Sequence, residues 1–203
     1  MESRQTNPTN LRVLTIGHSD HALEHFLTLL RVYSVDVVAD TRSYPYSNFA
    51  PQYDQEPLRT AVQGAGLQYV HLGKELGGRP DGEEFYDAKG HVLYDKVAAT
   101  EIFKAGIARI EQGIRKYNVA LLCSEENPAG CHRRLLVGRV LTDAGIEVEH
   151  IRGDGRLQPE SELAQELDAK HPQLDLFAST EAPEWKSIPS VLRKKRPSSS
   201  SAF

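Results

Sequence analysis

Short apolar runs alternate along the chain with longer segments in which apolar residues recur every three or four positions. The short runs combine apolar with β-branched residues and predict buried strands at 12–17, 35–39, 67–72, 119–123 and 147–151. The longer segments predict helices at about 23–30, 57–63, 98–116, 131–144 and 161–170. This alternation predicts a Rossmann-like, three-layer α/β fold, with a mostly parallel sheet of about five strands and helices on both faces.

Polar residues follow these strands at their carboxyl ends, where open α/β sheets bind their ligands. His18 and Ser19 follow the first strand, and Asp40, Arg42 and Ser43 follow the second. The fourth strand is the most hydrophobic, so we expect it near the centre of the sheet. Candidate chemistry is therefore expected along one rim of the sheet.

Composition divides the chain into three parts. Residues 1–10 are polar and predict a disordered lead, residues 11–178 a single α/β domain, and residues 179–203 a flexible tail rich in basic residues and serine. The basic run Arg193 to Arg196 is typical of a solvated end, or of an electrostatic tether to nucleic acid or another anionic surface. Trp185 is a candidate docking residue for the tail.

Charge and cysteine content narrow the function classes. The 203 residues carry a net charge of −4, which is no global electrostatic footprint for nucleic acid. Two cysteines cannot form a disulfide scaffold, and no apolar run is long enough to cross a bilayer. We therefore expect a cytoplasmic protein that does not enter membranes.

The segment from Leu121 to Arg134 is the predicted active centre. Asn127 followed by Pro128 is a strong helix-start signal, because Asn caps a free backbone N–H and Pro fits the first helical turn. Backbone N–H groups and the helix dipole then form an anion site at the start of the 128–144 helix. Arg133 adds a guanidinium suited to phosphate.

Four residues are candidates for catalysis. A thiol in the first helical turn has a lowered pKa, so Cys131 is a candidate nucleophile with His132 as its acid–base partner. Glu125 and Asp40 are candidate proton-transfer groups. The alternative for each cysteine is plain packing in the core. Cys123, Cys131 and His132 offer three metal-ligand atoms, but their spacing matches no zinc pattern, so we expect no metal and no cofactor.

Two further interpretations concern residues on the same rim. Cys123 and Cys131 could form a redox pair, although they are not a Cys-x-x-Cys motif. Several residues are candidates for binding the substrate or its anionic group, the alternatives being tight turns for the glycines and satisfied strand-end contacts for the histidine. These residues are His18, Ser19, Arg42, Ser43, Tyr46, Gly77, Gly78, Arg79 and Arg133.

The chain resembles the domain-of-unknown-function 488 (DUF488) family. The resemblance rests on motifs in order along residues 12–156: Thr15 to Ser19, Asp40 to Ser47, Leu76 to Arg79, Leu122 to Arg133, and His150 to Gly155. It implies an α/β domain and marks Arg42, Ser43, Gly77, Gly78, Cys123, Cys131, His132 and Arg133 as motif positions. It supplies no reaction. Asn48 stands where members often carry Arg, which removes one positive charge from the expected anion site.

Three functions fit these residues. The first is an enzyme that hydrolyses a glycosidic or phosphoester bond in a phosphate-bearing substrate, a nucleotide or nucleic acid, with aromatic residues such as Tyr46 stacking a base. The second is a non-catalytic nucleic-acid-binding module whose affinity comes from the basic tail. The third is a thiol-dependent redox or sulfur-handling protein that uses Cys131.

Overall fold

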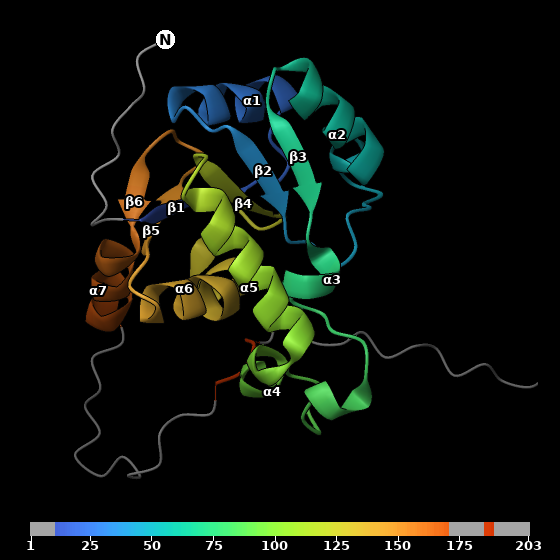
Figure 1. Cartoon of the computed structure of the whole chain (residues 1–203), viewed down its shortest axis with the longest axis vertical. Helices are drawn as coiled ribbons and strands as arrows, with labels where there is room; N and C mark the ends of the chain where they lie inside the picture. Colours follow the sequence, from blue (N-terminus) through green and yellow to red (C-terminus); the bar gives the residue numbers. More distant parts are fainter. Residues whose placement is uncertain (1–10, 171–184, 189–203) are drawn as a thin grey trace, which may run out of the picture.

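The computed structural model describes residues 11–170 and 185–188, whose strands form one twisted sheet (Figure 1). The strands are β1 (Arg12–Gly17), β2 (Val37–Asp40), β3 (Gln68–His71), β4 (Val119–Cys123), β5 (Glu147–Ile151) and β6 (Leu157–Pro159). Their order across the sheet is β3-β2-β4-β1-β5-β6. All pairs are parallel except that of β5 with β6, so the mostly parallel sheet is confirmed, with one strand more than expected.

Helices cover both faces of this sheet (Figure 1). They are α1 (Leu23–Val32), α2 (Gln55–Gly64), α3 (Gly73–Leu76), α4 (Tyr94–Ala99), α5 (Glu101–Ile114), α6 (Arg139–Asp143) and α7 (Glu160–Lys170). Short 3-10 turns lie at η1 (Pro51–Tyr53), η2 (Glu83–Phe85) and η3 (Pro128–Gly130), and η4 (Arg133–Gly138) is a π-helix. The expected α/β architecture with three layers is therefore confirmed in the described residues.

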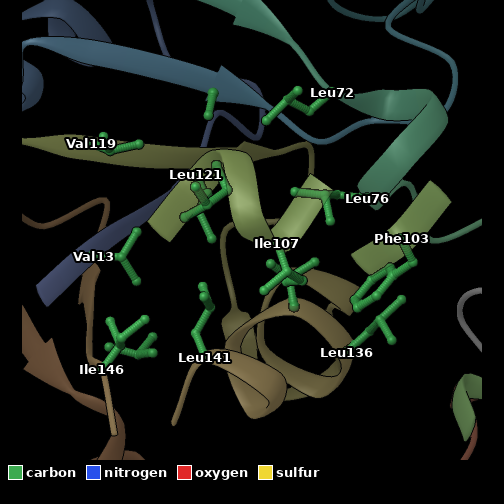
Figure 2. Packing of buried hydrophobic residues seen from close by; sticks show 14 of the residues in the cluster. Val13, Leu72, Leu76, Phe103, Ile107, Val119, Leu121, Leu136, Leu141 and Ile146 are labelled. Carbon is green, nitrogen blue, oxygen red and sulfur yellow. The ribbon is translucent and has the colours of Figure 1, made fainter. Parts of the chain in front are cut away.

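Alternation along the strands separates two hydrophobic clusters, because successive side chains of a strand point to opposite faces. Leu14 and Leu122 point toward α1 and α2, where they pack in one cluster with Phe26. Val13 and Leu121 point to the other face and join the cluster built with α5, η4 and α6 (Figure 2). β4 lies between β2 and β1 with all of its residues buried, as expected for the most hydrophobic strand.

Two expected elements differ from the structure. The helix predicted at 98–116 begins earlier and breaks at Thr100, whose side chain caps α5 by accepting from the Phe103 N–H at 3.3 Å. The single helix predicted at 131–144 is wrong. The backbone is extended at Cys131 (φ −89°, ψ 143°), so a 3-10 turn, a π-helix and the short α6 replace it. π-helical turns occur frequently at functional sites.

Segments near the two ends were predicted as a lead and a tail. The lead 1–10 lies outside the described residues, and so does the tail apart from 185–188. These four residues contact the domain: the Trp185 indole N–H donates to the Leu135 carbonyl at 2.6 Å, and Lys186 forms a β-bridge with Leu93. Trp185 thus docks this segment. Within the part of the chain that the structure covers, no helix has the length and apolar character to span a membrane.

Candidate functional site

Cys123, Cys131 and His132, here called the dithiol cluster, meet at the carboxyl end of β4. The Cys131 Sγ lies 3.0 Å from the Cys123 Sγ. The His132 Nδ1 lies 3.5 Å from the Cys123 Sγ and 3.9 Å from the Cys131 Sγ. All three side chains are buried, at 6%, 1% and 5% exposure respectively. Two sulfurs and an imidazole nitrogen therefore contact one another away from bulk water.

Local chain geometry brings the two cysteines together. Cys123 is the last residue of β4, and the chain then reverses through η3, which Asn127 caps by accepting from the Ala129 N–H at 3.0 Å. The predicted cap at Asn127 and the Pro128 start are therefore present, although they begin a single 3-10 turn. The extended backbone at Cys131 returns its thiol to the end of β4.

The His132 ring is fixed from its other side. Its Nε2 lies 3.1 Å from the Thr41 carbonyl and 3.3 Å from the Thr41 hydroxyl. Because a carbonyl only accepts, Nε2 carries a proton and Nδ1 faces the sulfurs. Gly78 leaves room for the ring, since a Cβ at this position would lie 2.6 Å from the His132 Cγ.

Electrostatics distinguish the two thiols. The hydrogen bond from Cys131 lowers the pKa of Cys123 well below its usual range, against burial, and the positive charges of His132 and Arg133 lower it further. Burial and the neighbouring Cys123 thiolate raise the pKa of Cys131. Burial lowers the pKa of His132, but the Cys123 charge and hydrogen bond raise it more, for a net upward shift. Cys123, which the sequence did not single out as a nucleophile, is therefore the favoured thiolate.

Arg133 holds the loop beside the cluster. Its side chain is fully buried and donates to the backbone carbonyls of Glu125 and Glu126, to the latter at 2.6 Å, and to the Thr15 hydroxyl at 3.3 Å. Arg134, next in the chain, forms an ion pair with Glu160 at 2.8 Å. Arg133, expected to capture a substrate anion, and its neighbour Arg134 both bind protein oxygens in the structure.

Asp40 and Arg42 form a second buried group at the end of β2. The Asp40 carboxylate accepts from the Arg42 Nη2 at 2.6 Å and Nε at 2.9 Å, and from the Tyr69 hydroxyl at 2.6 Å. The Arg42 Nη1 donates to His18 Nε2 at 3.1 Å and to the Tyr53 carbonyl at 2.9 Å. Burial, with the adjacent Arg42 charge, lowers the pKa of His18 to about 4. Asp40 thus anchors Arg42 and His18.

The loop after β4 carries two carboxylates, the predicted Glu125 and its neighbour Glu126, which have different surroundings. Glu126 pairs with Arg152 at 2.9 Å, and that hydrogen bond lowers its pKa. Glu125 is half-buried, and burial and the Cys123 charge raise its pKa. Glu125 is therefore the carboxylate beside the thiols.

A hollow of about 390 Å³ is lined by several further predicted residues. Ser43, Gly77 and Arg79 line it together with Lys74, and the Ser43 hydroxyl accepts from the Arg79 N–H at 3.0 Å. Tyr46 is exposed, with its hydroxyl 3.4 Å from the Gln55 side chain. Ser19 has positive φ and contacts Asp20 at 3.3 Å. Within the described residues, no side chain of these five predicted residues hydrogen-bonds the dithiol cluster, so the structure does not gather the predicted site in one place.

Two residues near the cluster escaped the sequence analysis. Thr41 orients His132 through its backbone carbonyl. In the sequence, the only signal for Thr41 is its position between the candidate residues Asp40 and Arg42. Tyr94 is fully buried, and its hydroxyl has no hydrogen-bond partner in the described structure. Burial raises the pKa of Tyr94, and the charges of Cys131, Cys123 and Glu125 raise it further, so the cluster affects the ionisation of this hydroxyl. Tyr94 lies at the start of a helix that the apolar pattern placed later, and no signal in the sequence indicated it.

Comparison of the sequence with known proteins matches it to one protein family. The family model described as "Domain of unknown function DUF488" matches residues 22–140, more than half of the chain and including the whole dithiol cluster. No curated protein and no solved structure matches the chain.

Proposed function

The chain belongs to the DUF488 family, and from this premise we propose that it is a thiol–disulfide oxidoreductase acting on small disulfides. Cys123 is the attacking thiolate and Cys131 the resolving thiol. The observation that carries the proposal is the 3.0 Å contact between the two sulfurs, with the His132 Nδ1 3.5 Å from the first. A disulfide bond measures about 2.05 Å, so the sulfurs need to approach by only about 1 Å.

The reaction consumes one disulfide, RSSR, per turnover. The Cys123 thiolate attacks one sulfur of RSSR, which forms a mixed disulfide and releases the first thiolate, RS⁻. Cys131 gives its proton to Glu125, the carboxylate whose pKa the Cys123 charge raises, and attacks the Cys123 sulfur. The second RS⁻ leaves, both leaving groups take up protons, and the protein is left with a Cys123–Cys131 disulfide. Two electrons pass from the protein thiols to RSSR, and a second thiol substrate restores the dithiol in the reverse sequence.

The surroundings of the cluster support this chemistry. The thiolate, not the thiol, is the nucleophile, and here the Cys131 thiol, His132 and Arg133 all favour the Cys123 anion, which raises the fraction of Cys123 that is ionised. Burial of both sulfurs restricts the reaction to small substrates. A reactive dithiol also fits a reducing compartment such as the cytoplasm.

Hydrolysis of a phosphate-bearing substrate is the second candidate. The hollow at Ser43 and Arg79 favours it, because Arg79 is exposed and could bind a phosphate there. Against it, Arg42 and Arg133 are buried and already bind Asp40 and backbone carbonyls. The nucleic-acid-binding interpretation depends on the basic tail, which lies outside the described residues.

Thiol release distinguishes these functions. Reduced protein, kept with a metal chelator, is mixed with a small aromatic disulfide that releases a coloured thiol. We expect about two equivalents of thiol from the native chain, and about one from Cys131→Ser, which stops at the mixed disulfide. Cys123→Ser should lose the fast phase, and peptide mass spectrometry should find the Cys123–Cys131 disulfide in the native chain alone.

Two results would contradict the proposal. Equal rates in Cys123→Ser and the native chain would exclude Cys123 as the nucleophile, and absence of the linked peptide would exclude resolution by Cys131. The hydrolase alternative predicts instead that Arg79→Ala abolishes release of phosphate or base from a nucleotide, while both cysteine variants retain it.

A further inference from the structure

We propose that the reduced dithiol cluster binds one zinc ion through Cys123, Cys131 and His132. This site goes beyond the oxidoreductase reaction: it uses the same three side chains but requires no electron transfer. Among the described residues, these form the one group of His, Cys and acidic side chains whose ligand atoms converge, all within 4.8 Å of one another.

The spacing of the three atoms suits a tetrahedral ion. With Zn–S near 2.3 Å and Zn–N near 2.0–2.1 Å, tetrahedral angles place two sulfurs about 3.8 Å apart, and a sulfur and a nitrogen about 3.6 Å apart. The two S–N distances, 3.5 and 3.9 Å, lie on either side of that value. The sulfurs, at 3.0 Å, would separate by about 0.8 Å, which a change in a cysteine rotamer allows.

His132 already has the orientation of a metal ligand. Ligating histidines almost always donate their second ring N–H to a carbonyl or carboxylate, which turns the lone pair of the other nitrogen toward the metal. Here Nε2 meets the Thr41 carbonyl at 3.1 Å and Nδ1 faces both sulfurs. The packing of Gly78 against the ring prevents its rotation, since even a Cβ there would lie within 2.6 Å.

The group supplies three ligand atoms, so a water would take the fourth position of a tetrahedral ion. The Tyr94 hydroxyl is a second and independent indication of a ligand, because it is fully buried and lacks any partner in the described residues. A buried hydroxyl costs free energy unless it is hydrogen-bonded, and a metal-bound water would satisfy it.

The sequence argument against zinc concerns local motifs. In zinc knuckles and fingers the ligands are closely paired along the chain, whereas Cys123 and Cys131 are separated by seven residues that include the turn η3. Because the structure brings these residues together through the chain reversal after β4, the spacing rule does not decide the matter. Zinc and the Cys123–Cys131 disulfide exclude each other, so bound zinc would protect the thiols from oxidation.

The full chain, reduced and stripped of metal, is titrated with zinc in competition with a chromophoric chelator. We expect one zinc per chain, and with cobalt(II) in its place the intense thiolate-to-metal absorption and tetrahedral d–d bands of a Cys₂His site. Cys123→Ser and Cys131→Ser should lose at least about tenfold in affinity, and His132→Gln a similar amount. His25→Gln is the control, because His25 is exposed and hydrogen-bonds the Gly153 carbonyl at 2.8 Å, and this variant should bind zinc as the native chain does.

A measurement without variants covers the case in which a cysteine variant fails to fold. Equimolar zinc should slow alkylation of both cysteines in the native chain by at least about tenfold. Absence of stoichiometric zinc binding would overturn the zinc site, and so would cobalt spectra without thiolate-to-metal bands. Either result would do so even if the thiol-release assay, run with a metal chelator, shows the disulfide reaction. Zinc binding without that reaction would keep the site and overturn the oxidoreductase, so the two proposals fail separately.

Discussion

Replacing Asp40 by Asn tests whether this carboxylate is a structural anchor. Asp40 is fully buried and Arg42 is 5% exposed, so the substitution leaves a guanidinium in the interior without its counter-ion. It also sets an amide N–H₂ against two donors, the Arg42 Nη2 and the Tyr69 hydroxyl, which now lie 2.6 Å from Oδ2. Breaking a buried ion pair by removing one partner costs about 3–5 kcal/mol. With an m-value of about 2 kcal/mol/M, the urea midpoint should fall by about 2 M.

The assay is urea unfolding at neutral pH, followed by circular dichroism, with Tyr69→Phe as the matched variant. Tyr69→Phe removes one hydrogen bond to the same carboxylate but keeps its charge, so it should cost only about 1.5–3 kcal/mol. In the double variant Asp40→Asn/Arg42→Met, the loss should be smaller than the sum of the single losses, because no unpaired charge remains. A smaller loss for Asp40→Asn than for Tyr69→Phe would refute the structural assignment. So would normal stability combined with a total loss of thiol–disulfide exchange.

Three further predictions concern pH, packing and access. The pKa of His18 is about 4 in the folded state and near 6.5 in the unfolded state, so the free energy of unfolding should decline as pH falls through this window. Between pH 7 and 5, with a metal chelator present, the native chain should lose about 2 kcal/mol more than His18→Gln. Parallel stability curves for the two proteins would contradict this. Gly78→Ala places a Cβ 2.6 Å from the His132 Cγ and should slow thiol release about a hundredfold, whereas Gly64→Ala, with open space around the new atom, should leave the rate unchanged. Trp185→Ala removes the hydrogen bond to the Leu135 carbonyl and the contact of the indole ring with the Arg139 guanidinium at 4.6 Å. Iodoacetamide should therefore label the two cysteines faster. An unchanged labelling rate would show that residues 185–188 do not restrict access of the reagent to the cysteines.

The fold was predictable where burial sets the pattern. β1, β4 and β5 have the predicted bounds: β1 and β4 are short, largely buried apolar runs, and β5 alternates polar with apolar residues. β6 was missed because a strand of three residues that ends in Pro159 has no readable alternation. The helix at 131–144 was wrong for another reason: its apolar residues have helical spacing, but the buried Arg133 side chain and the extended Cys131 backbone alter the hydrogen-bond pattern.

The sequence predicted which residues belong to the candidate site, but it did not predict which of them contact one another. Sequence reasoning selected Cys131, His132 and Arg133 because their residue types suit nucleophilic and anion chemistry. It assigned the guanidinium to a substrate, since nothing along the chain shows that the carbonyls of Glu125 and Glu126 come within its reach. Partners such as these are set by how the loop after β4 folds back, which is a tertiary property. For the same reason, sequence reasoning raised a Cys123–Cys131 pair only as an alternative interpretation.

Arg133, Cys123 and Cys131 are held in place by the same chain reversal after β4. Arg133 ties the backbone at 125 and 126 to Thr15 on β1, and the same chain reversal places Cys131 against Cys123. Gly17 shows how close this packing is, because a Cβ there would meet the Glu125 carbonyl oxygen at 1.8 Å. A guanidinium used in this way is satisfied before any substrate arrives, so it cannot also serve as the main phosphate ligand without releasing the loop. The groups left with chemistry to perform are those whose partners are one another: two sulfurs, an imidazole and a neighbouring carboxylate.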